Sequence, residues 1–419
     1  MSYRASDGTR QWDGSKKVPE ERMAMKMTSF ARTGITPDIA GADLSYALKL
    51  QYSRWKAKDL RVTMEVTPSD VGKPQVPTRG FHWNDAKYTH EHRFDTGTKT
   101  QKYYKDGKCI HSREDEVGIN AIVTDLAVDG GIVESDSYCC PSCGAISTVR
   151  ELMNGCPYCK ARFLMPDLFP KVTNFYFYED DSSKVDFIRN TVIVGAVIAA
   201  LYELVQCLES RQLLDFVMVP VAGLMGAFIG LMCGGFAFLG YAIYKAIQGI
   251  SEVGGSKSAE RKIERKMQAF DSAFSYKLFE GQLLSFLKMA LFTEEPGNLA
   301  CFEGTSIPER YRDLVDMSYH GTIALKGIET DDDTVKMNLG VFLRDTYYTN
   351  NHIKIKDEEI RLQVARKRSA RTDAGFSIKK VECRACGGSF DASHQRICPY
   401  CHNAYDMKEH NWVITRIEK

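Results

Sequence analysis

The longest apolar segment lies near the centre of the chain. Residues 216–244 contain no charged side chain, whereas a helix that crosses the hydrocarbon core of a bilayer needs about 20 residues. A shorter apolar run, residues 191–202, precedes it and extends to residue 208 if Glu203 lies near the end of a span, where a carboxylate can reach the interface. The pattern therefore predicts a two-span transmembrane hairpin over residues 187–247.

Charged flanks set the expected orientation of this hairpin. Lys184 and Arg189 precede the first span and a cluster of lysines and arginines follows the second, whereas the connection between the spans contains only Arg211. Because cations are held on the cytoplasmic side during insertion, we expect both termini in the cytoplasm. Residues 1–30 contain charges and no continuous apolar core, so we expect no signal peptide. The predicted location is a cell membrane.

Three glycines recur at every fourth position of the second span: Gly226, Gly230 and Gly234. This spacing places them on one helix face, where the missing side chains let another backbone approach closely. We predict a helix-packing face, which serves either the contact with the first span or an association between copies of the chain.

Eight of the 13 cysteines form two groups of four with a repeated spacing. Each group has two Cys-x-x-Cys knuckles, and two knuckles complete a tetrahedral metal site. The first group is Cys140, Cys143, Cys156 and Cys159, and the second is Cys383, Cys386, Cys398 and Cys401. We predict two structural zinc ions, with iron in a rubredoxin-like site as the alternative.

Two further features refine the metal prediction. Cys139 competes with Cys140 as a ligand, but Cys140 restores the spacing of the other knuckles. Gly144 and Gly387 follow a knuckle at a position where a turn with positive φ is expected. Disulfides are disfavoured because both groups belong to the predicted cytoplasmic side.

The flanking regions predict an α+β fold with several parts. Residues 44–60 and 259–291 have helical spacing, and a shorter helix is expected at 308–317. Alternating or β-branched residues predict strands elsewhere, among them four between residues 87 and 128, with a hairpin turn at Asp106–Gly107, and one at residues 374–383. The predicted parts are a mobile tail (1–27), a β-rich N-terminal domain (28–138), a zinc ribbon (139–170), the hairpin, and an α+β domain (256–419) with a second zinc ribbon inserted at 381–405.

Composition and motifs narrow the function. Lysine and arginine number 55 against 54 aspartate and glutamate, which excludes a strongly basic nucleic-acid coat, and the surroundings of the second ribbon are of mixed charge. We find no Walker-type glycine loop and no GxSxG elbow. His320, Asp345 and His352 could act in acid–base chemistry, but their spacing does not pair them, and we assign no catalytic residue. The histidines between residues 82 and 111 are interpreted as surface residues.

The C-terminal region has a characteristic order of elements: the amphipathic helix, the apolar stretch 270–291, the segment 308–317 and paired strands that end in residues 411–416. This order resembles the Tim-forty-four-like domain family. It covers about residues 256 to 419. It implies a cone-shaped fold like that of nuclear transport factor two, and membrane-proximal docking as in the relatives that attach a protein-import motor to a membrane. The predicted spans and ribbons depart from the mitochondrial relatives, so we expect a bacterial plasma membrane rather than a mitochondrial inner membrane.

These features together predict a membrane-anchored scaffold. Its zinc-stabilised cytoplasmic domains would dock a protein partner or lipid at the bilayer, in connection with protein transport, and it would associate with a partner protein or with itself. Two alternatives are a membrane-bound enzyme with a pocket in the cone-shaped domain and a zinc-ribbon protein that binds nucleic acid at the membrane.

Overall fold

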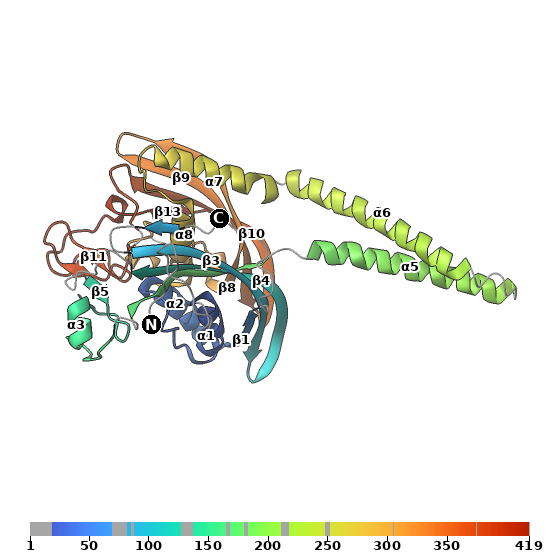
Figure 1. Cartoon of the computed structure of the whole chain (residues 1–419), viewed down its shortest axis with the longest axis horizontal. Coiled ribbons are helices and arrows are strands. Elements are labelled where there is room, and N and C mark those ends of the chain that lie inside the picture. Colours follow the sequence, from blue (N-terminus) through green and yellow to red (C-terminus); the bar gives the residue numbers. More distant parts are fainter. Residues whose placement is uncertain are drawn as a thin grey trace, which may run out of the picture. The chain divides into compact units, whose positions relative to one another are not determined.

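The structure is a computed structural model that describes residues 19–68, 82–84, 88–126, 137–164, 168–179, 183–210, 218–247, 252–304, 306–373 and 375–418 (Figure 1). The chain divides into two compact units. Residues 1–179 and 256–419 form the first, called the sheet unit below, and residues 180–255 form the second, called the helix-pair unit.

The sheet unit is built on one nine-stranded sheet that contains strands from both halves of the chain. Its order is β1-β3-β4-β7-β8-β9-β10-β13, with β2 paired to β3. The strands are β1 (Arg61–Pro68), β2 (His82–Asn84), β3 (Tyr88–Lys105), β4 (Lys108–Leu126), β7 (Lys171–Glu179), β8 (Leu314–Thr330), β9 (Thr334–Thr349), β10 (His352–Lys367) and β13 (Val413–Ile417).

The two halves of the chain meet in the sheet at β7 and β8. This is a parallel pair, registered at Tyr178 and Tyr319, whereas the other strand pairs of the sheet are antiparallel. The structure therefore differs from the expectation of separate domains over residues 28–138 and 256–419. The sequence predicts strands in both regions, but local patterns do not determine which distant strands become neighbours.

Helix α1 (Pro19–Thr33) replaces the last part of the predicted mobile tail. Met23, Met27 and Phe30 are almost fully buried and are spaced by four and three residues, which places them on one helix face. Apolar burial, rather than local polarity, therefore decides the structure of residues 19–27. The remainder of the predicted tail lies outside the described residues.

Helix α2 (Ala42–Ala57) is buried on more than one side. Leu44, Leu48 and Trp55 belong to a core formed with α1, β1, β3, β4 and β7. Tyr46 and Ala47 belong to a second core, formed mainly by α7 (Glu252–Gln268), α8 (Tyr276–Phe292) and strands β8 to β10. A helix with apolar side chains in two directions is stable only between two packed layers.

Polar side chains of α2 also bind the C-terminal half. The guanidinium of Arg54 donates to the carbonyl oxygens of Leu291 and Phe292 at the C-terminal end of α8, at 3.3 Å each. The indole Nε1 of Trp55 donates to the carbonyl of Val315 at 2.6 Å, and Gln51 donates to the carboxylate of Asp316 at 2.6 Å. A cation at the carbonyl end of a helix is favourable because the macrodipole is negative there.

Several predicted elements differ in length. The strands predicted between residues 87 and 128 merge into two long strands, joined by the predicted turn, at which Asp106 and Gly107 have φ values of 48° and 77°. Residues 308–317 contain the short 3-10 helix Glu309–Asp313 followed by the start of β8, rather than an α-helix. The strand predicted for residues 374–383 shortens to β11 (Val381–Glu382).

The helix-pair unit contains α5 (Ser183–Ser210) and α6 (Met218–Ile247). Within the described residues, one segment is long and apolar enough to cross a membrane, Val219–Phe236 in α6. The apolar part of α5, Asn190–Tyr202, is shorter than a span. The two-span prediction is thus supported for the second helix by length and composition, and the first helix does not meet that criterion.

Small residues bring α5 and α6 into backbone contact. A Cβ added at Gly226 would lie 2.3 Å from the carbonyl oxygen of Gly195, and one at Gly230 would lie 2.4 Å from the carbonyl of Thr191. Gly234 is also buried. The glycine face predicted from the sequence therefore lies, at Gly226 and Gly230, against the preceding helix of the same chain.

This contact can be tested with an engineered disulfide between the two helices. A Cβ at Gly223 would lie 3.8 Å from the Cβ of Ala200, close to the separation of about 3.8 Å found in disulfides. In a chain with Cys207 and Cys233 replaced by serine, Ala200→Cys with Gly223→Cys should form the bond on mild oxidation of membranes, as measured by protease mapping. Adding Gly226→Leu should abolish formation of this disulfide, because the new side chain would collide with the backbone of α5. Gly240→Leu is the control, because a Cβ there meets no atom within 4 Å, and equal loss with both leucines would contradict the assigned contact.

Candidate metal centres and an adjoining cavity

Four cysteine knuckles with the same backbone geometry build two groups that could each hold a metal ion. In each knuckle, the residue after the second cysteine donates its N–H to the carbonyl of the first, at 2.7 to 3.0 Å. That residue has positive φ in all four: 76° at Gly144, 64° at Lys160, 70° at Gly387 and 58° at His402. The prediction for the two glycines is confirmed, and two non-glycine residues adopt the same turn.

The eight predicted cysteines come together as two groups of four. In each group the Sγ atoms lie within 4.8 Å of one another. The first group belongs to ribbon 1 (residues 137–164), which contains β5 (Ser137–Cys139), β6 (Ile146–Thr148) and α3 (Val149–Asn154). The second belongs to ribbon 2 (residues 381–405), which contains β11 and β12 (Ser389–Phe390).

The sulfur positions fit a tetrahedral metal ion. The Sγ atoms of Cys140 and Cys159 lie 3.6 Å apart, and those of Cys143 and Cys156 lie 3.8 Å apart. The corresponding distances in ribbon 2 are 3.6 and 3.7 Å. A tetrahedron with zinc–sulfur bonds of about 2.3 Å has edges of about 3.8 Å. A disulfide would need about 2.05 Å, and these cysteines are free.

The thiols of ribbon 1 differ in acidity. Burial raises the pKa of Cys140 to about 12. The backbone N–H of Ala161 lowers the pKa of Cys159 to about 6. Because metal ions bind thiolates, loading of this group must release the protons that its less acidic members hold at neutral pH.

Cys139 lies outside the metal groups. Its buried Sγ donates to the carbonyl oxygen of Lys379 at 3.7 Å, and so links ribbon 1 to the segment that leads into ribbon 2. The choice of Cys140 over Cys139 as the fourth member of the first group agrees with this arrangement.

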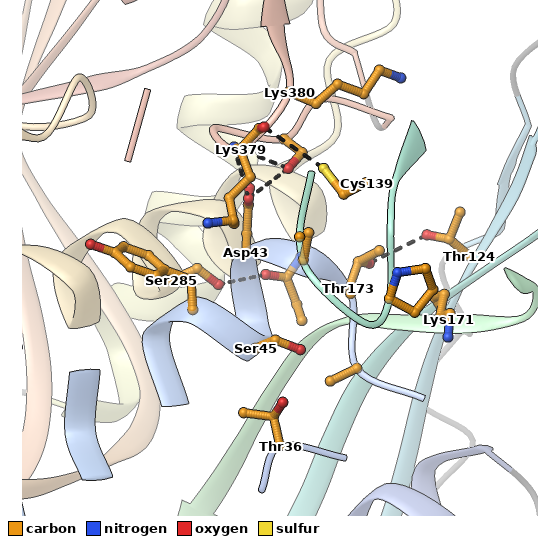
Figure 2. Close-up of a pocket in the computed structure, with 18 of the residues that line it drawn as sticks. Thr36, Asp43, Ser45, Thr124, Cys139, Lys171, Thr173, Ser285, Lys379 and Lys380 are labelled. Carbon is orange, nitrogen blue, oxygen red and sulfur yellow. Dashed lines mark hydrogen bonds between the residues drawn. The ribbon is translucent and has the colours of Figure 1, made fainter. Parts of the chain in front are cut away.

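A cavity of about 510 Å³ lies between α2, ribbon 1, α8, β7 and the segment 375–380. Its volume is within the range of about 300 to 1,000 Å³ that is typical of small-molecule sites. Figure 2 shows Asp43, Cys139, Lys379 and Lys380 at one end of the cavity, and Thr36 and Ser45 at the other. The knuckle residues Cys140 to Ser142 and Gly144 form part of its wall.

Side chains of α2 fix the ribbon 2 side of the cavity. The carboxylate of Asp43 accepts hydrogen bonds from the hydroxyl of Ser377 at 2.6 Å and from the backbone N–H of Ile378 at 3.0 Å. The hydroxyl of Tyr46 donates to the carbonyl of Ser393 at 3.2 Å and lies 3.3 Å from Nδ1 of His394. Burial raises the pKa of Asp43, and the hydrogen bonds that its carboxylate accepts from Ser377 and Ile378 oppose this increase.

Comparison with family models, with curated proteins and with solved structures finds no match for this chain. The class of protein is therefore defined by its own features: an α+β unit with two four-cysteine centres and a cavity, joined to a pair of apolar helices. The sequence does not reveal the cavity, because its walls come from segments spread between residues 36 and 394.

The three residues considered for acid–base chemistry lie on three different strands, β8, β9 and β10. His320 lies 3.1 Å from the carboxylate of Asp357, which also accepts two hydrogen bonds from Arg344. These partners lower the pKa of Asp357, against the opposing effect of burial. His352 is exposed at the start of β10.

The burial of one histidine and one aspartate was not predicted from the sequence. His90 is fully buried, not at the surface, and its Nδ1 lies 2.9 Å from the hydroxyl of Thr124. Asp345 is also fully buried, and neither of its carboxyl oxygens has a hydrogen-bond partner among the described residues. Burial, followed by the charge of Glu358, raises the pKa of Asp345 well above its usual range.

Zinc content tests the assignment of the ligands. Serine at both Cys140 and Cys143 should lower the metal bound per purified chain from about two ions to about one, because a site with two thiolates binds zinc weakly. Elemental analysis by mass spectrometry measures this ratio. Replacement of the exposed Cys109 and Cys233, which belong to neither group, is the matched control and should leave the ratio unchanged. Unchanged stoichiometry in the first variant would refute the site.

The buried carboxyl group predicts a pH dependence of stability. The folded-state pKa of Asp345 is raised, whereas an unfolded aspartate titrates near about 3.9. Above that pH the unfolded chain releases a proton that the folded chain retains, so the contribution of Asp345 to the free energy of unfolding falls as pH rises. Asp345→Asn carries no such proton.

The expected result is that the stability of the Asp345→Asn variant relative to the parent increases between about pH 5 and about pH 8. Urea unfolding curves followed by tryptophan fluorescence give both values. Asp332→Asn, at an exposed turn, is the control. Parallel pH curves for the parent and Asp345→Asn would show that the carboxyl group is ionised in the folded state.

Proposed function

We propose that this chain is a membrane-anchored docking protein. The helix-pair unit inserts into a bilayer, and the sheet unit, with one zinc ion in each ribbon, provides a binding site for a partner molecule. The main support for this proposal is the outer surface of α5 and α6. Large apolar side chains that are more than two-fifths exposed line both helices. They include Ile193, Val197, Ile198 and Leu201 on α5, and Leu224, Met225, Phe228, Ile229 and Phe236 on α6.

Water is an unfavourable solvent for such a surface. Soluble monomers rarely expose contiguous apolar patches larger than a few hundred Å², and burial of each large apolar side chain is worth about 1.5–3 kcal/mol. Only 17% of the residues in the span of α6 are buried within the protein. A bilayer covers the rest, and the close pairing of α5 with α6 supports insertion of both helices as a hairpin.

The charges that flank the pair support a cytoplasmic location for both ends. Arg261, Lys262, Arg265 and Lys266 on α7 are exposed and follow α6 closely in the chain. Cations at this position favour the cytoplasmic side. A reducing compartment also keeps the eight cysteines available as zinc ligands. Zinc is the ion proposed because it prefers four thiolates in a closed tetrahedral site.

The proposed docking role is consistent with the Tim-forty-four-like resemblance, in that α7 and α8 precede the paired strands β8 to β10. The proposal includes a connection between this docking function and protein transport. Docking is supported better than catalysis because none of His320, Asp345 and His352 lines the large cavity.

Membrane retention tests the proposal directly. The full chain should remain in the pellet after alkaline carbonate extraction. Arginine at both Leu224 and Phe228, near the middle of the span, should release it, because each costs about 2.5–3.5 kcal/mol on insertion scales. Arginine at Ile35 and Leu164 is the matched control: these side chains are 73% and 70% exposed, comparable to Leu224 at 73% and Phe228 at 65%, but belong to the sheet unit. A parent chain that is itself extracted would overturn the proposal.

A further inference from the structure

We propose that the cavity between α2, ribbon 1 and the segment 375–380 is a binding site for an organic anion with an apolar, flat body. The inference goes beyond the docking role and does not depend on insertion into a bilayer. It rests on the shape of the cavity, on the side chains that line it, and on the balance of charge around it.

The cavity provides apolar walls for the body of such a ligand. Tyr88, Phe169 and Tyr138 form a continuous aromatic cluster, with ring centroids 5.6 and 5.2 Å apart, and all three line the cavity. Phe286 and Leu50 line it from α8 and α2. Ligand sites combine walls of this kind with a small number of polar groups that fix orientation.

Positive charge exceeds negative charge around the cavity. Lys49, Lys171, Lys379 and Lys380 line it, together with Asp38 and Asp43. Both aspartates are already engaged, since Asp38 pairs with Lys26 and Asp43 accepts hydrogen bonds from the segment 377–379. Neither therefore supplies a free carboxylate for a cationic ligand.

Two of these lysines are available to an anion. Lys379 pairs with Asp391 at 2.5 Å, and Lys171 donates to the carbonyl of Asp38 at 2.5 Å. Lys49 and Lys380 have no ion pair in the part of the chain that the structure describes. These two lysines line the cavity from α2 and from the entry to ribbon 2, two segments that are far apart in sequence.

The start of α2 adds to the preference for an anion. Gly41, Ala42 and Asp43 line the cavity, and the N-cap residue Gly41 provides no side-chain acceptor for the first turn. Backbone N–H groups at a helix start and the positive end of the macrodipole both favour negative charge. The cavity, the lysines and the helix start thus point to the same class of ligand.

The metal centres hold two walls of this site in place. Cys140 to Ser142 and Gly144 are wall residues in a zinc knuckle, and Lys379 and Lys380 directly precede ribbon 2. Ribbon 1 contributes only four buried residues to the small core around it, Cys140, Val149, Leu152 and Cys156, so metal binding rather than apolar packing fixes its knuckles. Loading of the first four-cysteine group is therefore a condition for ligand binding.

A pair of probes that differ only in charge tests the site. The full chain in phosphatidylcholine nanodiscs is titrated calorimetrically with 1-naphthalenesulfonate and, separately, with the uncharged 1-naphthalenesulfonamide, against empty nanodiscs. Lys49→Gln with Lys380→Gln should weaken sulfonate binding about tenfold, because hydrogen bonds to a charged group are lost. Sulfonamide binding should stay within about twofold of the parent, since the apolar walls are intact.

Two variants complete the test. Lys262→Gln with Lys266→Gln removes the same charge from exposed positions of α7 outside the cavity, and it should leave both affinities unchanged. Ser45→Phe, which fills one end of the cavity, should weaken both probes. Equal loss of sulfonate binding in the two lysine variants, or no saturable sulfonate binding by the zinc-loaded parent up to millimolar concentrations, would overturn the proposal.

Nanodiscs that contain phosphatidylglycerol distinguish the source of the anion. If the natural ligand is an anionic lipid, that lipid should compete with 1-naphthalenesulfonate in the parent chain and not in the Lys49→Gln/Lys380→Gln variant. If the ligand is a soluble carboxylate, phosphate or sulfonate, the affinity should be the same in both kinds of disc. Both outcomes retain the anion site and differ only in what fills it.

Discussion

Helix α2 is the element on which the rest of the sheet unit depends. Its apolar side chains enter two cores at once, and Arg54 binds the carbonyl end of α8 from the N-terminal half of the chain. At its other end, Asp43 and Tyr46 hold the segments that flank and form ribbon 2. One buried helix therefore positions the shared sheet, the second four-cysteine group and one side of the cavity, which are otherwise assembled from distant parts of the chain.

The four-cysteine groups and α2 have complementary roles. Ribbon 1 adds only Cys140, Val149, Leu152 and Cys156 to a small core, so in our proposal metal binding supplies most of its folding free energy, whereas Val381, Phe390 and Ala392 of ribbon 2 pack into the main core. The helix determines where the ribbons lie relative to the sheet. The cavity needs both contributions, because its walls combine a ribbon 1 knuckle, the start of α2 and the residues that lead into ribbon 2. In our proposal, metal ions bound by the cysteine groups would support ligand binding indirectly, through the shape of the cavity.

Features with a local cause could be predicted from the sequence. The cysteine spacing predicted both four-cysteine groups, the Asp106–Gly107 pair predicted its hairpin turn, and the uncharged segment predicted the apolar helix α6. Features that depend on packing between distant segments could not be predicted from the sequence. The pairing of β7 with β8 depends on one sheet forming from both halves, and α1 is ordered because Met23 and Phe30 become buried. His90 and Asp345 are polar residues whose burial no local pattern indicates.

The central claim is that both halves of the chain fold as one unit around α2. Hydrogen exchange of the zinc-loaded full chain, measured by mass spectrometry at increasing subdenaturing urea concentrations, tests it most directly. The account predicts that β3 and β4 of the N-terminal half and β9 and β10 of the C-terminal half open with the same free energy and the same dependence on urea. Exchange of one strand pair at urea concentrations that leave the other fully protected would show two independent domains and contradict the account.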